Sequence, residues 1–271
     1  MPMPMTPWSP WSFLAGLAGR RLLGGAALAL ALLPALAAPA PKRLFLTEPF
    51  PPYTYERGGK PAGPMVDVLD KVCEQLGWRC EVRVMPWRRS LALAEQGEAH
   101  GLFAMYDAPE RRPYFALSPA ILQARYTLFG RQGETLKYKG PASLGGRTVA
   151  AYGPSGASIV LEELSRGLKV QLATEADNLT VLRMLHAGRY GPQGLVLMNE
   201  AVALWLSAQN EMPPLQAVGT VRQFGYHFGL SRQRLSAAEQ RRFGQAVQQL
   251  CRSGRMAELL QPYALPAAPC T

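Results

Sequence analysis

Histidine is scarce in this chain, and the Cys-x-x-Cys pair common in metal sites is missing. The 271 residues include only His100, His186 and His227, which lie far apart in the sequence. Because zinc sites need closely spaced Cys and His ligands, we expect no metal. The chain also lacks a phosphate-binding glycine loop, a Ser/His/Asp order and a Cys/His pair. We therefore expect no cofactor, and binding in place of catalysis.

Acidic residues are outnumbered by basic ones, with 19 Asp and Glu against 29 Lys and Arg, for a formal net charge of +10. Such an excess can indicate a nucleic-acid partner. Here the basic residues are scattered in nothing longer than pairs, and no nucleic-acid-binding motif is present, so we expect no such partner. The apolar share of 48% and the charged share of 18% exclude extended disorder, collagen and coiled coil.

Long apolar runs are missing except near the N-terminus. Residues 1–21 contain no acidic residue, residues 22–33 are apolar, and an Ala-Leu-Ala motif ends at Ala37. This order is typical of a secretory signal peptide. The apolar run is shorter than the ~20 residues that span a bilayer, which argues against a retained anchor. We predict a signal peptide over 1–37, and leave open whether an Arg-Arg pair in it indicates the twin-arginine or the general pathway.

Export would place the four cysteines in an oxidising compartment. Four cysteines allow three pairings. Proximity in the sequence favours Cys73–Cys80 and Cys251–Cys270. The first bond would tie the end of a helix to the next strand, and the second would pin the C-terminal tail across the last helix. We expect each bond to stabilise the protein by ~2–4 kcal/mol.

Strand and helix patterns alternate along the rest of the chain. Strands are expected over 43–47, 81–85, 101–105, 126–130, 148–152, 170–172, 195–198 and 226–230. Helical spacing of apolar residues predicts helices over 65–76, 87–96, 157–164, 179–185 and 201–208, and a capping box at Ser236-x-x-Glu239 begins a last helix. The alternation predicts an α/β fold of two similar units, with a largely parallel sheet and helices on both of its faces.

Several motifs of the chain are informative through their order and spacing. They are FPPY (50–53), MPWRRSL (85–91), APERR (108–112), SLGGRTVAAYGPSG (143–156), LVLMNEAVA (195–203) and CRSGRMAELL (251–260). Together they resemble the periplasmic solute-binding proteins of the amino-acid-binding type, bacterial extracellular solute-binding protein family 3. The resemblance extends from about Leu44 to Tyr263.

The resemblance implies a two-lobe periplasmic-binding-protein-like (type II) fold that closes on a small ligand by hinge motion. Lobe 1 would comprise 42–125 plus 230–271, and lobe 2 would comprise 130–225. Two hinge crossings would lie at 126–129 and 226–229. The resemblance also implies a monomer in the periplasm that delivers its ligand to the permease of an ABC transporter. A sensor or accessory domain is the alternative, and a dehydratase-like enzyme on the same fold is a weaker one.

The resemblance assigns a carboxylate-binding half to the site. Arg111 matches the arginine that clamps the ligand carboxylate through two parallel hydrogen bonds. Ser155 and Gly156 match a turn whose free amides favour the same anion, although plain N-capping by the serine is the alternative. Phe50 and Trp87 match aromatic positions that sandwich the ligand's side chain.

Two departures weaken the half of the site that would hold an ammonium group. Asn199 stands where the family usually has an aspartate for the ligand's α-ammonium, and an amide oxygen is only a neutral acceptor. A serine or threonine acceptor is replaced near Met105 and Tyr106. Glu48 or Glu200 could substitute, although Glu200 is also a first-turn acid that the helix dipole favours. A nearby tyrosine of the FPPY motif is expected to pack within lobe 1.

Overall fold

A computed structural model describes residues 40–270 of the protein. The predicted signal peptide, residues 1–37, therefore lies outside the described residues. Between residues 40 and 270, none of the helices combines the length and the apolar character that crossing a membrane requires.

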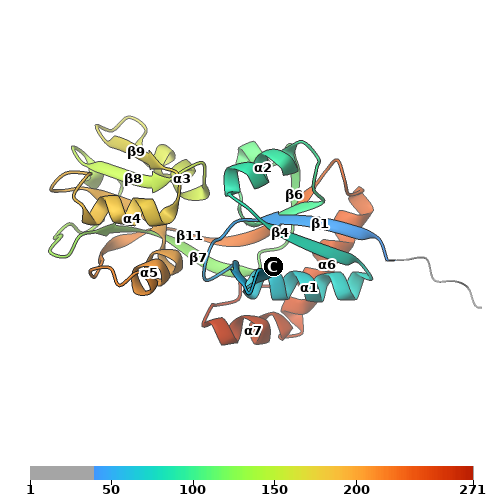
Figure 1. The fold of residues 1–271 in the computed structure, drawn as a ribbon. Coiled ribbons are helices and arrows are strands. Elements are labelled where there is room, and N and C mark those ends of the chain that lie inside the picture. Colours follow the sequence, from blue (N-terminus) through green and yellow to red (C-terminus); the bar gives the residue numbers. More distant parts are fainter. Residues whose placement is uncertain (1–39, 271) are drawn as a thin grey trace, which may run out of the picture. The chain divides into compact units, whose positions relative to one another are not determined.

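One sheet of nine strands forms the centre of the described protein (Figure 1). Its strands are Lys42–Thr47 (β1), Arg79–Val84 (β4), Gly101–Tyr106 (β5), Phe115–Leu117 (β6), Leu122–Gly130 (β7), Thr148–Tyr152 (β8), Gln171–Glu175 (β9), Leu195–Asn199 (β10) and Gln216–Ser231 (β11). The order is β4-β1-β5-β11-β7-β10-β8-β9, and β6 pairs with β11. A separate hairpin joins Tyr55–Arg57 (β2) to Lys60–Ala62 (β3).

The sheet has two parallel parts. Strand β1 is parallel to β4 and β5, and strand β8 is parallel to β9 and β10. We call these parts the β1 half and the β8 half. Between them β7 and β11 pair antiparallel with each other, with β11 also antiparallel to β5 and β7 to β10. The predicted parallel pairing thus holds inside each half, and the crossings are antiparallel because one leaves the β1 half and the other returns to it.

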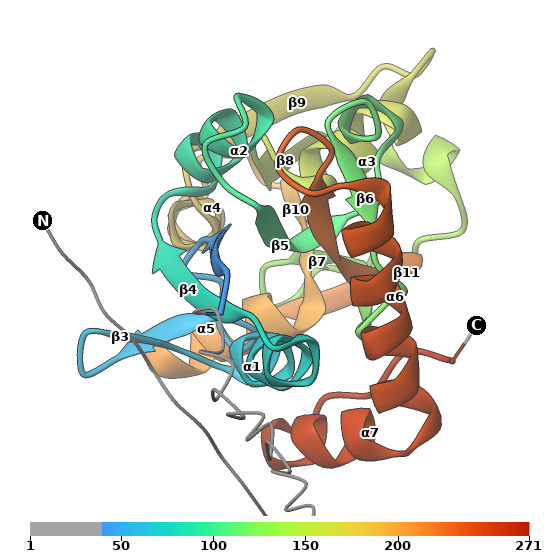
Figure 2. The same cartoon turned by 90° about the vertical axis from the view of Figure 1, so that its right-hand side faces the viewer.

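Seven α-helices are described, at Pro64–Leu76 (α1), Trp87–Glu95 (α2), Gly156–Ser165 (α3), Asn178–His186 (α4), Glu200–Gln209 (α5), Ala237–Arg252 (α6) and Arg255–Leu260 (α7). In the β1 half, α2 lies on one face of the sheet, and α1, α6 and α7 lie on the other (Figures 1 and 2). Helix α1 ends where the sequence predicts, because Gly77 adopts the left-handed conformation with a φ of 66°. Helix α6 begins at the predicted capping box.

Alternating side chains of the β8 half pack against different helices. Val149 and Ala151 of β8 share a hydrophobic cluster with α3, whereas Ala150 shares one with α4. Because successive side chains of a strand point to opposite faces, α3 and α4 cover opposite faces of this half. The predicted arrangement of helices on both faces is therefore confirmed.

Strand β11 is much longer than the strand predicted over 226–230. It covers 16 residues and shifts register between Ala217 and Gly219 and again between Thr220 and Arg222. Each shift moves the following side chains relative to the partner strand, so the alternating pattern breaks. Strand β6 and the β2–β3 hairpin were not predicted either.

Both predicted disulfides, Cys73–Cys80 and Cys251–Cys270, are present. The second bond holds the C-terminal tail, which also pairs with the start of β7. The Gln123 amide donates to the Pro266 carbonyl at 2.9 Å, and the Ala268 amide donates to the Ile121 carbonyl at 3.1 Å. The tail is therefore fixed by a covalent bond and by backbone hydrogen bonds.

Candidate functional site

All eight residues predicted to bind a ligand line one small cavity, which we call the central cavity. They are Glu48, Phe50, Trp87, Tyr106, Arg111, Ser155, Gly156 and Asn199. The lining also includes Ala104, Tyr126, Tyr152, Ala157, Asn178 and Tyr226. The cavity volume is about 20 Å³, which is room for roughly one water molecule. A larger ligand therefore requires the lining residues to separate.

The ends of the strands explain why these residues meet. Tyr106 ends β5, Tyr152 ends β8 and Asn199 ends β10. Glu48 directly follows β1, and Phe50 lies two residues further along the chain. Carboxyl ends of parallel strands share one edge of a sheet, where α/β proteins commonly bind ligands. Each half of the sheet therefore contributes its own carboxyl-end edge to the central cavity.

Arg111 is a buried cation without an acidic partner. Its residue is only 4% exposed, and no carboxylate of residues 40–270 lies within salt-bridge distance of it. Its Nη1 donates to the Tyr106 carbonyl at 3.2 Å, and the guanidinium lies 5.2 Å from the centre of the Trp87 ring. Burial lowers the pKa of Arg111, and neighbours including Tyr126 and Glu110 oppose that shift. A buried, unpaired charge is costly, so an anion next to Arg111 would be strongly favoured.

Trp87 provides a second unused donor at the same wall. Its side chain is buried, and its indole Nε1 has no hydrogen-bond partner among the described residues. Buried polar groups are usually hydrogen-bonded, and exceptions often mark a functional site. The wall formed by Arg111 and Trp87 thus holds N–H donors and a positive charge.

Asn199 is already fully engaged as an acceptor. Its Oδ1 accepts from the Val202 amide at 3.1 Å and from the Tyr53 hydroxyl at 3.1 Å, while its Nδ2 donates to the Tyr226 hydroxyl at 3.2 Å. The bond from Val202 identifies the side-chain oxygen, because a backbone amide can only donate. Asn199 therefore caps α5 and offers no free lone pair to a ligand ammonium in this conformation.

Tyr53, which the sequence predicts to pack within lobe 1, also makes a bond that was not predicted. Its ring does pack there, against Phe50 and Tyr226. Its hydroxyl, however, reaches Asn199 at the end of β10 and so links the two halves of the sheet. Sequence spacing could not reveal this bond, because the two residues are 146 positions apart.

Glu48 makes a second link between the halves. The Tyr152 hydroxyl donates to its Oε2 at 3.0 Å. Burial of the carboxyl group raises the pKa of Glu48 to about 8, and the hydrogen bond from Tyr152 and the charge of Arg111 only partly oppose this. The carboxyl is therefore mainly protonated near neutral pH and can donate a hydrogen bond.

Glu200, the other glutamate considered for the ammonium, does not line the central cavity. It forms an ion pair with Arg125 and accepts from Thr127 Oγ1 at 2.7 Å. The hydrogen bonds from these two residues lower its pKa against the opposing effect of burial. Glu200 is thus an ionised, bonded group of a different surface.

Ser155 and Gly156 lie at the N-terminus of α3. The Ser155 hydroxyl accepts from the Ala157 and Ser158 amides and donates to the Tyr152 carbonyl, so it caps the helix. The capping alternative is therefore what the structure shows for this side chain. Gly156 faces the other half closely: a Cβ there would lie 2.7 Å from Tyr106 Cβ.

Sequence reasoning missed three tyrosines of the cavity, Tyr126, Tyr152 and Tyr226. The hydroxyls of Tyr126 and Tyr226 are hydrogen-bonded to each other, and burial raises the pKa of both. A signal was present, since Tyr126 and Tyr226 begin the two predicted crossings and Tyr152 ends a strand directly before the Gly-Pro-Ser-Gly turn. Side chains at the carboxyl ends of predicted strands are thus as informative about a ligand site as the motifs are.

The sequence profile of the bacterial extracellular solute-binding proteins, family 3, matches residues 43–266. The chain belongs to this family. The two-lobe α/β fold that the motifs implied is therefore confirmed, and members of the family bind solutes outside the cytoplasm. Among curated proteins, no relative matches the chain.

Solved structures of similar fold include three of interest for this solute-binding protein. A histidine kinase sensor domain with similarity to periplasmic binding proteins has a TM-score of 0.75 and 20% identity, covering 85% of this chain and 99% of the other. An ancestral arginine-binding protein has a TM-score of 0.72 and 18% identity, covering 84% and 100%. The ancestral amino-acid-binding protein AncCDT-1, a precursor of cyclohexadienyl dehydratase, has a TM-score of 0.68 and 16% identity, covering 82% and 94%.

Proposed function

We propose that this solute-binding protein binds a small, amino-acid-like carboxylate in the central cavity by closing its two lobes. The observation that carries the proposal is the buried Arg111, which has no acidic partner among the described residues and lies beside the unpartnered indole N–H of Trp87. A carboxylate would neutralise the guanidinium and accept from both side chains. The lobes are residues 42–125 with 230–271, and residues 130–225.

The other lining residues contact different parts of the ligand. The positive end of the α3 dipole, at Ser155 and Gly156, complements the carboxylate from the β8 half, although the Ala157 and Ser158 amides already donate to Ser155 Oγ. Phe50 and Trp87 offer ring surfaces for the ligand's apolar part. Tyr106 offers a hydroxyl that now accepts from Arg222 Nη1 at 2.7 Å.

The ligand lacks a free α-ammonium, or is a modified amino acid or a peptide. Asn199 supports this, because its oxygen already accepts two hydrogen bonds and carries no charge. An ammonium group buried there would lose its hydration without gaining an anionic partner. Among the described residues that line the cavity, Glu48 is the one acidic group, and it could serve as the acceptor only by losing its proton.

We place this activity in the periplasm, with a monomer that passes its ligand to the permease of a membrane transporter. Sensing is the second candidate, since a histidine kinase sensor domain has the same fold. A permease gene beside the gene for this protein would favour transport, whereas a kinase gene there would favour sensing.

An enzyme of dehydratase type is a weaker candidate that rests on Glu48. A carboxyl with a pKa of about 8 in a cavity resembles a general acid, and one relative of this fold is a dehydratase precursor. Turnover of cyclic carboxylates by the purified protein would favour this reading over binding alone.

A thermal-shift screen tests the binding proposal. The panel contains amino acids, peptides and organic acids, each paired with its primary amide. A carboxylate at 100 times its dissociation constant should stabilise the protein by ~2.7 kcal/mol, while its amide should have little effect because it cannot neutralise Arg111. Equal shifts from acids and amides, or no shift across the panel, would contradict the proposal.

A further inference from the structure

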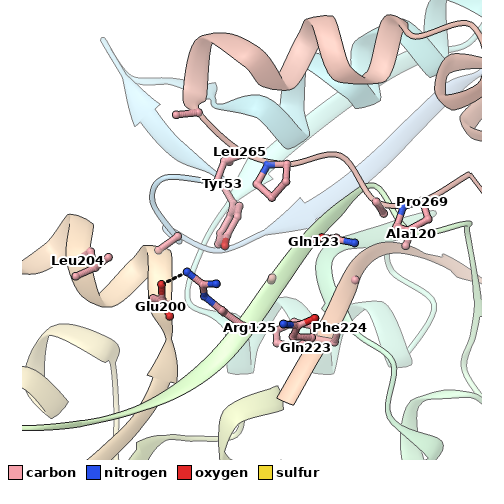
Figure 3. A pocket seen from close by; sticks show the side chains of 16 residues that line it. Tyr53, Ala120, Gln123, Arg125, Glu200, Leu204, Gln223, Phe224, Leu265 and Pro269 are labelled. Atoms are coloured by element: carbon pink, nitrogen blue, oxygen red, sulfur yellow. Dashed lines mark hydrogen bonds and ion pairs between the residues drawn. The ribbon is translucent and has the colours of Figure 1, made fainter. Parts of the chain in front are cut away.

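A second and larger cavity shares no lining residue with the central one (Figure 3). It lies along β7 and β11, between the start of α5 and the C-terminal tail. Its volume is about 500 Å³, within the range of about 300–1,000 Å³ that is common for small-molecule sites. The cavity is therefore large enough for a ligand without any movement of the chain.

The C-terminal tail forms one wall of this cavity and is fixed in place by a disulfide and by hydrogen bonds. Residues 264–266, 268 and 269 line the cavity. The same segment is held by the Cys251–Cys270 disulfide and by backbone hydrogen bonds to Ile121 and Gln123. A wall that is fixed before binding reduces the entropic cost of holding a ligand.

Several of the side chains that line the cavity are apolar. Leu204 on α5 is 53% exposed, and Leu265 and Pro269 of the tail lie across from it (Figure 3). Leu204 is one of four large hydrophobic residues that are exposed between residues 40 and 270, and the one of these four that lines the cavity. Together Leu204, Leu265 and Pro269 give the cavity apolar surface that suits the apolar body of a ligand.

Charge in the cavity comes from Arg125 and Glu200, which bond to each other (Figure 3). The Arg125 side chain is 52% exposed, so its guanidinium can donate hydrogen bonds to another partner. Glu200 has a second donor in Thr127, at 2.7 Å, and would stay hydrogen-bonded if the arginine turned away. Arg125 can therefore bind a ligand carboxylate at little cost in free energy, either together with Glu200 or in its place.

We propose that this second cavity binds an apolar monocarboxylate, with its carboxylate on Arg125 and its apolar body against Leu204, Leu265 and Pro269. The proposal for this second cavity does not rest on the carboxylate ligand proposed for the central cavity. The two are physically linked, because Asn199 lines one cavity and Glu200, the next residue, lines the other. Tyr53 also lines the second cavity while its hydroxyl bonds to Asn199.

The test uses 4-phenylbutyrate as the probe and calorimetry or NMR titration as the readout. We expect saturable binding to the wild type, and binding that is about tenfold weaker in Arg125→Gln, which loses the charge-assisted bond. Arg83→Gln is the matched control, since Arg83 is also a half-exposed arginine paired with a glutamate. The neutral 4-phenylbutyramide should bind more weakly than the acid.

Two further variants separate this site from the central cavity. Glu200→Gln should strengthen probe binding, because the competing carboxylate is removed from Arg125. Because the probe is also a carboxylate without an ammonium group, it can bind the central cavity as well, so Arg111→Gln should leave the binding event that depends on Arg125 intact while weakening any binding in the central cavity. The proposal is overturned if the probe does not saturate, if Arg125→Gln binds it like the wild type, or if Arg111→Gln abolishes its binding.

Discussion

The two cavities contain arginines in opposite situations. Arg111 in the central cavity is buried and has no carboxylate partner among the described residues, whereas Arg125 in the second cavity is half exposed and paired with Glu200. Burying an unpaired charge costs free energy that only a counter-charge recovers, while an exposed pair contributes little. The comparison indicates that an anion would gain more free energy in the central cavity, where it would meet an unpaired buried charge, than in the second cavity, where Arg125 already has a partner.

Replacing Arg111 should produce the largest effect. In Arg111→Ala we expect binding of the central-cavity carboxylate to weaken by ~2–5 kcal/mol, because the ligand's charge loses its buried partner. Calorimetry measures the affinity, and circular dichroism checks that the variant is folded. The neighbouring Arg112→Ala is the control, since Arg112 is exposed and paired with Asp107. Wild-type affinity in Arg111→Ala would refute the carboxylate clamp.

A methyl group at Gly156 should hinder closure of the central cavity. The added Cβ would press on Tyr106 and on the Tyr126 hydroxyl, and such overpacking typically costs ~1–3 kcal/mol. We therefore expect Gly156→Ala to bind the ligand more weakly and to be more extended in small-angle scattering. Gly244→Ala is the control, because its Cβ would meet only Pro119 Cδ at 3.6 Å. A Gly156→Ala variant as compact and as tight-binding as the wild type would contradict the model of closure.

An aspartate at position 199 should change ligand preference. Asn199→Asp adds a charged acceptor, and hydrogen bonds to charged groups exceed neutral ones by about 1 kcal/mol. Free α-amino acids should gain affinity in this variant relative to carboxylates without an ammonium group, as measured by competition calorimetry. Tight binding of an unmodified amino acid to the wild type would show instead that Glu48 serves as the acceptor.

Glu48 should make stability depend on pH. Its pKa is 4.5 in the unfolded chain and about 8 in the folded protein, so the folded state holds the proton more tightly. The resulting stabilisation is fully present below 4.5 and is lost as the pH rises through about 8. Urea unfolding of wild type and Glu48→Gln should therefore show a stability difference that moves against the wild type as pH rises over this window. A difference that stays constant with pH would be inconsistent with a buried, protonated carboxyl.

The smallest effect on the central cavity is expected from Arg125. Arg125→Ala removes an exposed ion pair, so stability should fall by no more than ~1 kcal/mol. Binding of the central-cavity carboxylate should stay within a similar margin of the wild type in calorimetry. A loss as large as that in Arg111→Ala would show that the two arginines serve the same ligand.

Local sequence patterns predicted the helices and most strands, but they could not predict how strands far apart in the sequence pair. Helix α1 was predicted almost to the residue, because its apolar spacing and the Gly77 that caps it are both local features of the sequence. The long strand β11 was mostly missed, since its register shifts near Gly219 break the alternation and are set by its partner β7. The antiparallel crossings follow from the return of the chain between halves, which no window of sequence contains.

For the site, motifs located residues but not their bonds. Arg111 was found through its motif, yet its lack of an acidic partner depends on how distant segments pack. The saturation of Asn199 depends on Tyr53, which is 146 residues away. Glu200 follows Asn199 directly and still lines the other cavity, because successive residues at a helix start point in different directions around the axis.

Formation of the C-terminal disulfide is a step in the maturation of the protein. Cys251 and Cys270 are 19 residues apart. Closing a loop of that size lowers the entropy of the unfolded chain, which stabilises the folded protein by about 3 kcal/mol. The bond secures the tail that forms one wall of the second cavity. In a reducing compartment the same chain would hold this wall by hydrogen bonds alone. An oxidising environment would thus complete this surface, and protein kept under reducing conditions would lack the covalent link that fixes the tail.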